Sequence, residues 1–131
     1  QRPYQLDVVA REFRNLRIQV AHFGFPWVDE CMVLIARHPN MYADLSFWLA
    51  MEQPWKILDQ LLRCPGYGCS YHKLFWATDN VFTPKINLDK FRSLNTWADK
   101  LNLPKIPDKD VEAMLGDNFA KFVRLEKKFK L

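Results

Sequence analysis

Glycine and long apolar runs are scarce in this sequence of 131 residues. Four Gly against eight Pro disfavour a repetitive all-β chain, which needs many tight turns. No run of about 18 apolar residues is present, so we predict no membrane span and no membrane partner. The sequence also shows no signal-peptide pattern and no Gly-rich phosphate loop, which disfavours secretion and a nucleotide cofactor.

Cysteine is also sparse, and its odd count of three disfavours a framework of disulfides. Cys64 and Cys69 bracket the sequence PGYG, which is not a standard spacing for zinc ligands. Cys31 falls within an apolar helical pattern and is predicted to lie in the core. We therefore expect a reducing compartment and a cytoplasmic location.

The sequence does contain enough apolar material for one globular domain, with 49% hydrophobic and 15% aromatic residues. The net charge is +4, and much of it lies in the tail KFVRLEKKFKL, residues 121–131. A basic tail can bind nucleic acid, but Phe119, Phe122 and Val123 favour a terminal helix with an apolar stripe and a solvated outer face. We therefore expect no nucleic-acid partner.

The apolar periodicity predicts the element order αβαβαβααα, which belongs to the α/β class. Strands are expected at 17–21, 41–46 and 73–77. Helices are expected at 3–13, 26–38, 53–63, 87–101, 108–116 and 117–128, with Asn87 as an N-cap and Gly116 as a stop. Because the strands lie too far apart for hairpins, we expect them to be parallel, with right-handed helical crossovers.

A polar side chain follows each predicted strand: His22 the first, Ser46 the second and Asp79 the third. Active sites of parallel α/β folds gather at the carboxyl ends of the strands, so His22 and Asp79 are expected to line one pocket. Each has a structural alternative, because a His after a strand is often a satisfied core residue and an Asp often caps a helix. Ser46 lacks a Ser–His–Asp context, and Asp44 is expected to make a structural hydrogen bond.

Aromatic residues cluster after two of the strand ends, at Phe25, Trp27, Phe47 and Trp48. Most of them are expected in the core, and one or two could wall a pocket for an apolar or aromatic substrate. His38 ends a predicted helix, where a positive charge suits the helix dipole, and is expected at the surface. His72 precedes a strand and is therefore expected at the opposite end of the sheet from the site.

Three segments resemble one family in the right order and at the right intervals. LRIQVAHFGFPWVDECMVLIARHPNMYADLS looks like strands six to seven of the amidohydrolase-related metal-dependent hydrolases, and HKLFWATDNVF looks like their strand eight. VEAMLGDNFAKFVRL resembles their closing helix. The branch that it resembles includes aminocarboxymuconate-semialdehyde decarboxylase and γ-resorcylate decarboxylase.

The resemblance implies a (β/α)8 barrel of the TIM type, of which residues 1–131 would be a single C-terminal segment holding about strands six to eight. It implies a divalent metal, with zinc expected, and a small-molecule substrate at the C-terminal mouth. Asp79 matches the strand-eight aspartate that binds the metal or its water and shuttles a proton. His22 matches the catalytic histidine of strand six.

The activity that this resemblance implies is a metal-dependent hydrolase acting on a small cyclic or aromatic acid. One alternative is the non-oxidative decarboxylation of an aromatic or muconate-type acid. A second alternative is a non-catalytic fragment or interaction module that keeps the fold without the metal.

The chain also departs from the family pattern. Ala77 stands where Gly is usual, and Asn80 and Val81 stand where an aromatic residue and Pro often follow the Asp. The family's strand-one H-x-H pair and strand-five histidine do not occur here, and one carboxylate cannot hold zinc tightly. We therefore predict that the N-terminal strands lie outside this chain. The isolated segment should be inactive and should associate with the missing part of the barrel or with a second copy of itself.

Overall fold

A three-stranded parallel sheet forms the centre of the described residues. The computed structural model describes residues 2–47, 52–79 and 84–125. The strands are β1 (Ile18–Val20), β2 (Met41–Asp44) and β3 (Leu74–Phe75), in the order β1-β2-β3. Gln19 pairs with Tyr42, and Asp44 pairs with Phe75. The predicted α/β class and parallel pairing are confirmed, but the single helix predicted at 87–101 is divided, so four α-helices rather than three follow β3 in the described ranges.

The strands are shorter than the sequence pattern predicts, for reasons that lie at their ends. After β1 the backbone of His22 turns into the left-handed region, with φ of 56°. After β3 the Trp76 N–H donates to the Met114 carbonyl of the C-terminal helical segment, at 2.8 Å, instead of extending the sheet. The first strand therefore stops where the backbone leaves the extended region, and the third stops where a backbone N–H finds a partner outside the sheet.

Helices surround the sheet. They are α1 (Asp7–Glu12), α2 (Val28–Arg37), α4 (Pro54–Arg63), α5 (Pro84–Arg92), α6 (Leu94–Leu101), α7 (Asp108–Glu112) and α8 (Asn118–Val123). A 3₁₀ turn, Pro3–Leu6, precedes α1, and a π-helical turn, Ala113–Asp117, joins α7 to α8. None of the helices in the described ranges is long and apolar enough to cross a membrane.

Two of the predicted helix boundaries are wrong. Asn87 does not cap a helix, because α5 begins at Pro84, whose fixed φ suits a first turn, and Asn87 lies buried inside it. The Ser93 hydroxyl donates to the Lys90 carbonyl at 2.7 Å where α5 gives way to α6. Gly116 does not stop a helix, because it lies inside the π-helical turn and the chain continues into α8.

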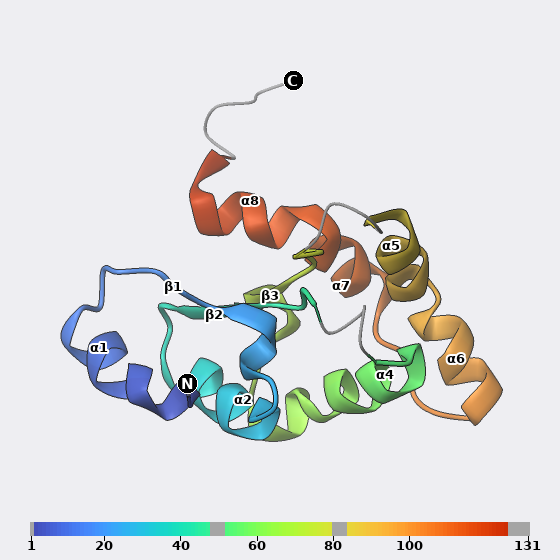
Figure 1. Cartoon of the computed structure of the whole chain (residues 1–131), viewed down its shortest axis with the longest axis horizontal. Coiled ribbons are helices and arrows are strands. Elements are labelled where there is room, and N and C mark those ends of the chain that lie inside the picture. The colour runs from blue at the N-terminus through green and yellow to red at the C-terminus, as the bar shows by residue number, and fades with distance from the viewer. Residues whose placement is uncertain (1, 48–51, 80–83, 126–131) are drawn as a thin grey trace.

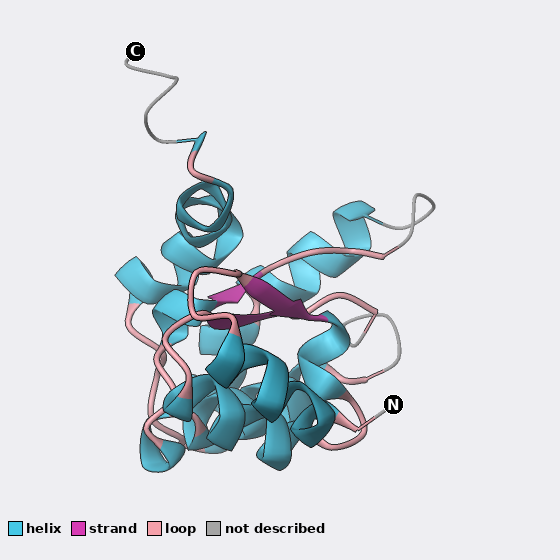
Figure 2. Ribbon diagram, turned by 90° about the vertical axis from the view of Figure 1, so that its left-hand side faces the viewer, coloured by secondary structure: helices cyan, strands magenta, loops and turns pink. Residues whose placement is uncertain are grey.

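The two faces of the sheet are covered by different helices. Figure 1 shows α2 and α4 on one side of the strands and α8 on the other, and Figure 2 shows the strands as the middle layer. Alternation along the strands turns Val20, Ala43 and Leu74 toward the α2 side, where all three are buried. Phe75 faces α8 and packs against Phe119, with ring centroids 5.3 Å apart.

The main core lies between the sheet and α2. Cys31, Met32 and Ile35 are fully buried there at the helical spacing that the sequence predicts, which confirms that Cys31 is a core residue. Burying one large apolar side chain of this kind contributes about 1.5–3 kcal/mol to folding. The three cysteines are free thiols. This packing fixes the loop that follows β1, and with it the position of His22.

Candidate functional site

The carboxyl edge of the sheet brings together the two residues that the sequence singles out for chemistry. His22 lies in the turn Ala21–Gly24 directly after β1, and Asp79 follows β3. His22 Nε2 lies 3.8 Å from Asp79 Oδ2, and their side chains are 35% and 52% exposed. The two groups therefore face each other across an open gap that is too wide for a hydrogen bond.

Backbone strain is concentrated at this edge. Four non-glycine residues at the ends of the strands have positive φ: His22 (56°), Phe23 (51°), Phe47 (58°) and Asp79 (55°). The other two with positive φ in the described ranges, Asn102 and Arg124, end helices, where this conformation is ordinary. Left-handed backbone costs about 1–2 kcal/mol per non-glycine residue, and such strain gathers at functional sites.

Close packing holds the loop after β1 in place. Gly24 has φ of 71°, and a Cβ built on it would lie 2.7 Å from Cys31 Cβ and 2.8 Å from Pro3 Cγ. Only glycine fits both this conformation and this contact. The loop is therefore fixed on α2 two residues after His22.

Asp44 ties the ends of β1 and β2 together. Its carboxylate is 2% exposed. Oδ1 accepts hydrogen bonds from His22 N at 3.1 Å, from Ser46 N at 3.0 Å and from Ser46 Oγ. Oδ2 accepts one from Gln19 Nε2 at 2.6 Å. Asp44 thus makes structural hydrogen bonds of the kind expected from its place inside a strand.

Ser46 connects this buried carboxylate to the imidazole. Its Oγ lies 2.9 Å from His22 Nδ1, on the side of the ring away from Asp79. The sequence pattern marks Ser46 and Asp44 only as separate residues and gives no direct sign of Gln19 or of the hydrogen bonds that connect them. Period-two alternation could have linked two of these residues, since Asp44 and Ser46 are two positions apart and so project from the same face of the strand and its extension.

The three aromatic candidates that the structure describes, Phe25, Trp27 and Phe47, do not converge on one pocket. The Phe47 ring packs on His22 with centroids 5.4 Å apart and is 39% exposed, as expected for a pocket wall. Phe25 lines a cavity of about 330 Å³ together with Gln19 and His22. Trp27 instead lines a separate depression beside Arg63, with the Arg2 guanidinium 5.8 Å above its ring. Trp48 lies outside the described residues.

A divalent metal would find only part of a ligand set in this chain. Within residues 2–47, 52–79 and 84–125, no three His, Cys, Asp or Glu side chains gather as they would around a metal ion. His22 and Asp79 offer one imidazole nitrogen and one carboxylate, both suited to zinc, but catalytic zinc sites have three protein ligands. The described residues therefore do not complete a metal centre by themselves.

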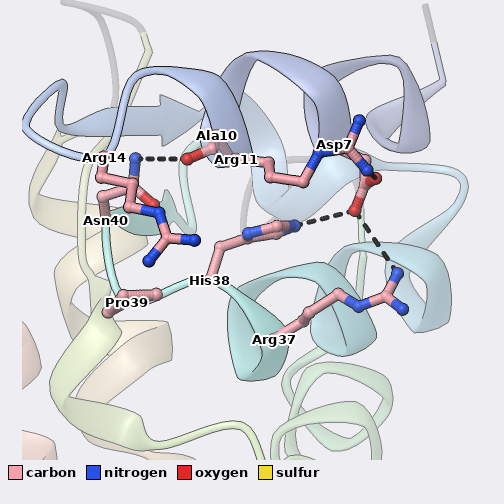
Figure 3. A pocket seen from close by; sticks show the side chains of 8 residues that line it. All are labelled: Asp7, Ala10, Arg11, Arg14, Arg37, His38, Pro39 and Asn40. Atoms are coloured by element: carbon pink, nitrogen blue, oxygen red, sulfur yellow. Dashed lines mark hydrogen bonds and ion pairs between the residues drawn. The ribbon is translucent and has the colours of Figure 1, made fainter.

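A second histidine–aspartate pair lies beside the amino ends of the strands. His38 Nε2 is 2.8 Å from Asp7 Oδ1, and Arg37 lies 3.5 Å from the same oxygen, in a cavity of about 340 Å³ (Figure 3). The hydrogen bond from His38 contributes most to holding the pKa of Asp7 below its ordinary value. The prediction that His38 lies at the surface is wrong, because the α1 carboxylate covers it and leaves it 8% exposed.

Comparisons with known proteins identify the family of the chain. The family model described as Amidohydrolase, which covers TIM-barrel proteins that generally use divalent metals, matches residues 1–125. Neither the curated proteins nor the solved structures gave a match. Since the family model spans nearly all of the 131 residues, the chain belongs to the amidohydrolase family.

Proposed function

We propose that the intact protein is a metal-dependent hydrolase acting on a small cyclic or aromatic acid. In this proposal residues 1–131 are the C-terminal segment of the barrel, and a part outside this chain supplies the other metal ligands. The observation that carries the proposal is the approach of His22 Nε2 to Asp79 Oδ2, at 3.8 Å, at the carboxyl edge of a parallel sheet.

The two side chains have distinct roles in this proposal. Asp79 supplies carboxylate oxygens that bind a cation or accept a proton, and its exposure leaves them accessible from the mouth of the barrel. His22 takes or gives a proton at Nε2, the ring nitrogen that faces the gap. A bound divalent metal, with zinc expected, would supply an activated water or a polarised substrate.

The aromatic side chains beside His22 support an apolar or aromatic substrate. Phe47 packs against the imidazole, and Phe25 lines the adjoining cavity of about 330 Å³. In this proposal Phe47 is an apolar wall beside His22, and the cavity that Phe25 lines, which Phe47 and Asp79 do not line, adds apolar space on the His22 side. Trp27 has no part in this pocket, because it lines another depression.

The resemblance to decarboxylases of aromatic and muconate-type acids supports a second reaction at the same pair. There His22 and Asp79 would transfer a proton to the substrate carbon as carbon dioxide leaves. Assays of the intact protein on a panel of aromatic carboxylates separate the two reactions, since decarboxylation releases carbon dioxide and hydrolysis releases an amine or alcohol.

The test of the enzymatic proposal combines metal analysis with Asp79→Asn in the intact protein. We expect bound divalent metal in the unmodified protein, and a loss of activity of about 10²–10⁴-fold in the variant, the range for removing a positioned proton-transfer group. Asp99→Asn is the control, because Asp99 is an exposed carboxylate on α6 that forms an ion pair with Lys105. A protein that has neither bound metal nor activity would instead support the non-catalytic module, and an Asp79→Asn variant with full activity would remove Asp79 from the proposed site.

A further inference from the structure

The hydrogen bonds around Asp44 determine the direction of the bond that it shares with Ser46. Oδ1 accepts from His22 N and Ser46 N, and Oδ2 accepts from Gln19 Nε2. Because both oxygens already accept from N–H donors, this arrangement favours the ionised carboxylate, which is an acceptor only. The Ser46 hydroxyl must therefore donate its single hydrogen to Asp44 Oδ1.

The Ser46 hydroxyl in turn determines which nitrogen of the His22 imidazole carries the proton. With its hydrogen committed to Asp44, Ser46 Oγ can only accept a bond from His22 Nδ1, 2.9 Å away. Nδ1 therefore carries the proton, and in the neutral ring Nε2 carries a bare lone pair. We propose that Asp44 and Ser46 are positioning residues that hold neutral His22 in its Nδ1–H form, with Nε2 presented to the gap as an acceptor.

This inference deepens the proposed function and rests on it for the use made of Nε2. His22 Nε2 and Asp79 Oδ2 are then two acceptors that face each other 3.8 Å apart. Two acceptors do not bond to each other, and a proton donor or a cation between them satisfies both. The buried Asp44–Ser46 chain thus prepares the imidazole to receive a proton or meet a cation without first changing its tautomer.

The chain carries an internal reference for this tautomer. His38 Nε2 lies 2.8 Å from the Asp7 carboxylate, which accepts the bond, so Nε2 of His38 carries a proton. His22 and His38 are thus expected to have opposite nitrogens protonated. His72 is the reference for a histidine that is largely in water, because its side chain is 64% exposed and its Nε2 lies 3.9 Å from Asp110 Oδ1, too far for a hydrogen bond.

Long-range ¹⁵N–¹H NMR of the ¹⁵N-labelled, metal-free chain tests the proposal, because it distinguishes protonated from bare ring nitrogens. The spectra are recorded at about pH 8.5, well above the ordinary imidazole pKa of about 6.5. We expect a protonated Nδ1 and a bare Nε2 for His22, and a protonated Nε2 for His38. Ser46→Ala should shift His22 toward the Nε2–H form that imidazole side chains favour in water, while Ser46→Thr should retain Nδ1–H.

A bare Nδ1 on His22 in the unmodified chain overturns the proposal, as does an unchanged Nδ1–H signal in a folded Ser46→Ala variant. If Ser46→Ala does not fold, the opposite tautomers of His22 and His38 in the unmodified chain decide the question. In the intact enzyme, Ser46→Ala should lower kcat by about 10–100-fold with little change in KM, and Ser46→Thr should restore it. An active Asp79→Asn enzyme would remove the proposed function while leaving the tautomer result intact.

Discussion

The two ends of the sheet each carry a histidine beside an aspartate, and the two pairs differ in every physical respect. At the amino end His38 and Asp7 are hydrogen-bonded at 2.8 Å, and the imidazole is nearly covered. At the carboxyl end His22 and Asp79 stand 3.8 Å apart, with much of both side chains exposed. The first pair is hydrogen-bonded to itself and joins α1 to the end of α2. In the second pair His22 Nε2 and Asp79 Oδ2 do not bond to each other and can meet another group.

The same contrast extends to the groups around each pair. At the amino end the Asn40 amide donates to the carbonyls of Ala10, Phe13 and Leu16, and Lys73 Nζ donates to the carbonyls of Ile35 and His38. At the carboxyl end the backbone turns through left-handed residues after all three strands. The amino end thus satisfies its polar groups internally and stabilises the fold, and the carboxyl end retains strain beside exposed acceptors.

The largest effect is expected from Asn40→Ala at the amino end. Asn40 is 6% exposed, and its loss removes the side-chain donor of three backbone carbonyls, of which that of Phe13 still accepts from Leu16 N. We expect a loss of about 3 kcal/mol in the free energy of unfolding, measured by urea denaturation. Gln19→Ala at the carboxyl end is the comparison, because it removes a single hydrogen bond, and it should cost about 1.5 kcal/mol since the acceptor is the buried Asp44 carboxylate. Equal losses at the two ends would contradict the comparison.

A smaller effect is expected when each aspartate loses its charge. Asp7→Asn should lower the urea midpoint at neutral pH, because Asp7 is hydrogen-bonded to His38 and lies near Arg37 and Arg11. Asp79→Asn should leave the midpoint unchanged, because an exposed pair at 3.8 Å contributes little to stability. A midpoint that responds more to Asp79→Asn than to Asp7→Asn would show that the two pairs have been assigned the wrong roles.

The stabilising effect of Asp7 also has a defined pH dependence. Its folded-state pKa lies below the ordinary value of 3.8, chiefly because of the hydrogen bond from His38. Its contribution to stability is therefore fully present above pH 3.8 and is lost as the pH falls through the lowered folded-state value. Urea unfolding across the acid range should show the gap between the unmodified chain and Asp7→Asn closing below pH 3.8. A gap that is constant over this range would contradict the assignment.

The sequence predicts the meeting of His22 and Asp79 at the carboxyl end because chain topology brings them there. Strands separated by helix-length segments must run parallel, so the residues after them meet at one edge, as His22 and Asp79 do. The buried state of His38 could not be predicted in the same way. Its partner, Asp7, lies 31 residues earlier, and a histidine at the end of a helix has an ordinary explanation in the helix dipole.

The hydrogen-bonded chain from Asp44 through Ser46 to His22 could be predicted only in part from the sequence. Its members are visible in the sequence as residues at strand ends, but their connection depends on the left-handed turn at His22. Asn87 and Gly116 show the limit of local patterns, since each has the residue type of a helix boundary and lies inside a helical segment. Asn118, the first residue of α8, is held by tertiary hydrogen bonds that a local pattern does not reveal. Its amide donates to the Tyr71 and Leu74 carbonyls and anchors the start of the helix.

The smallest expected effect isolates the backbone strain at Asp79 from its carboxylate. Asp79→Gly and Asp79→Ala both remove the carboxylate, but only glycine accepts φ of 55° without strain. The glycine variant should be more stable by roughly 0.5–1 kcal/mol, after allowing for the greater freedom of glycine in the unfolded chain. At Asp89, an exposed position inside α5, the order should reverse, with alanine more stable by about 1 kcal/mol. If alanine is also the more stable residue at position 79, the carboxyl edge is not strained there, and the contrast between the two ends rests on hydrogen bonding alone.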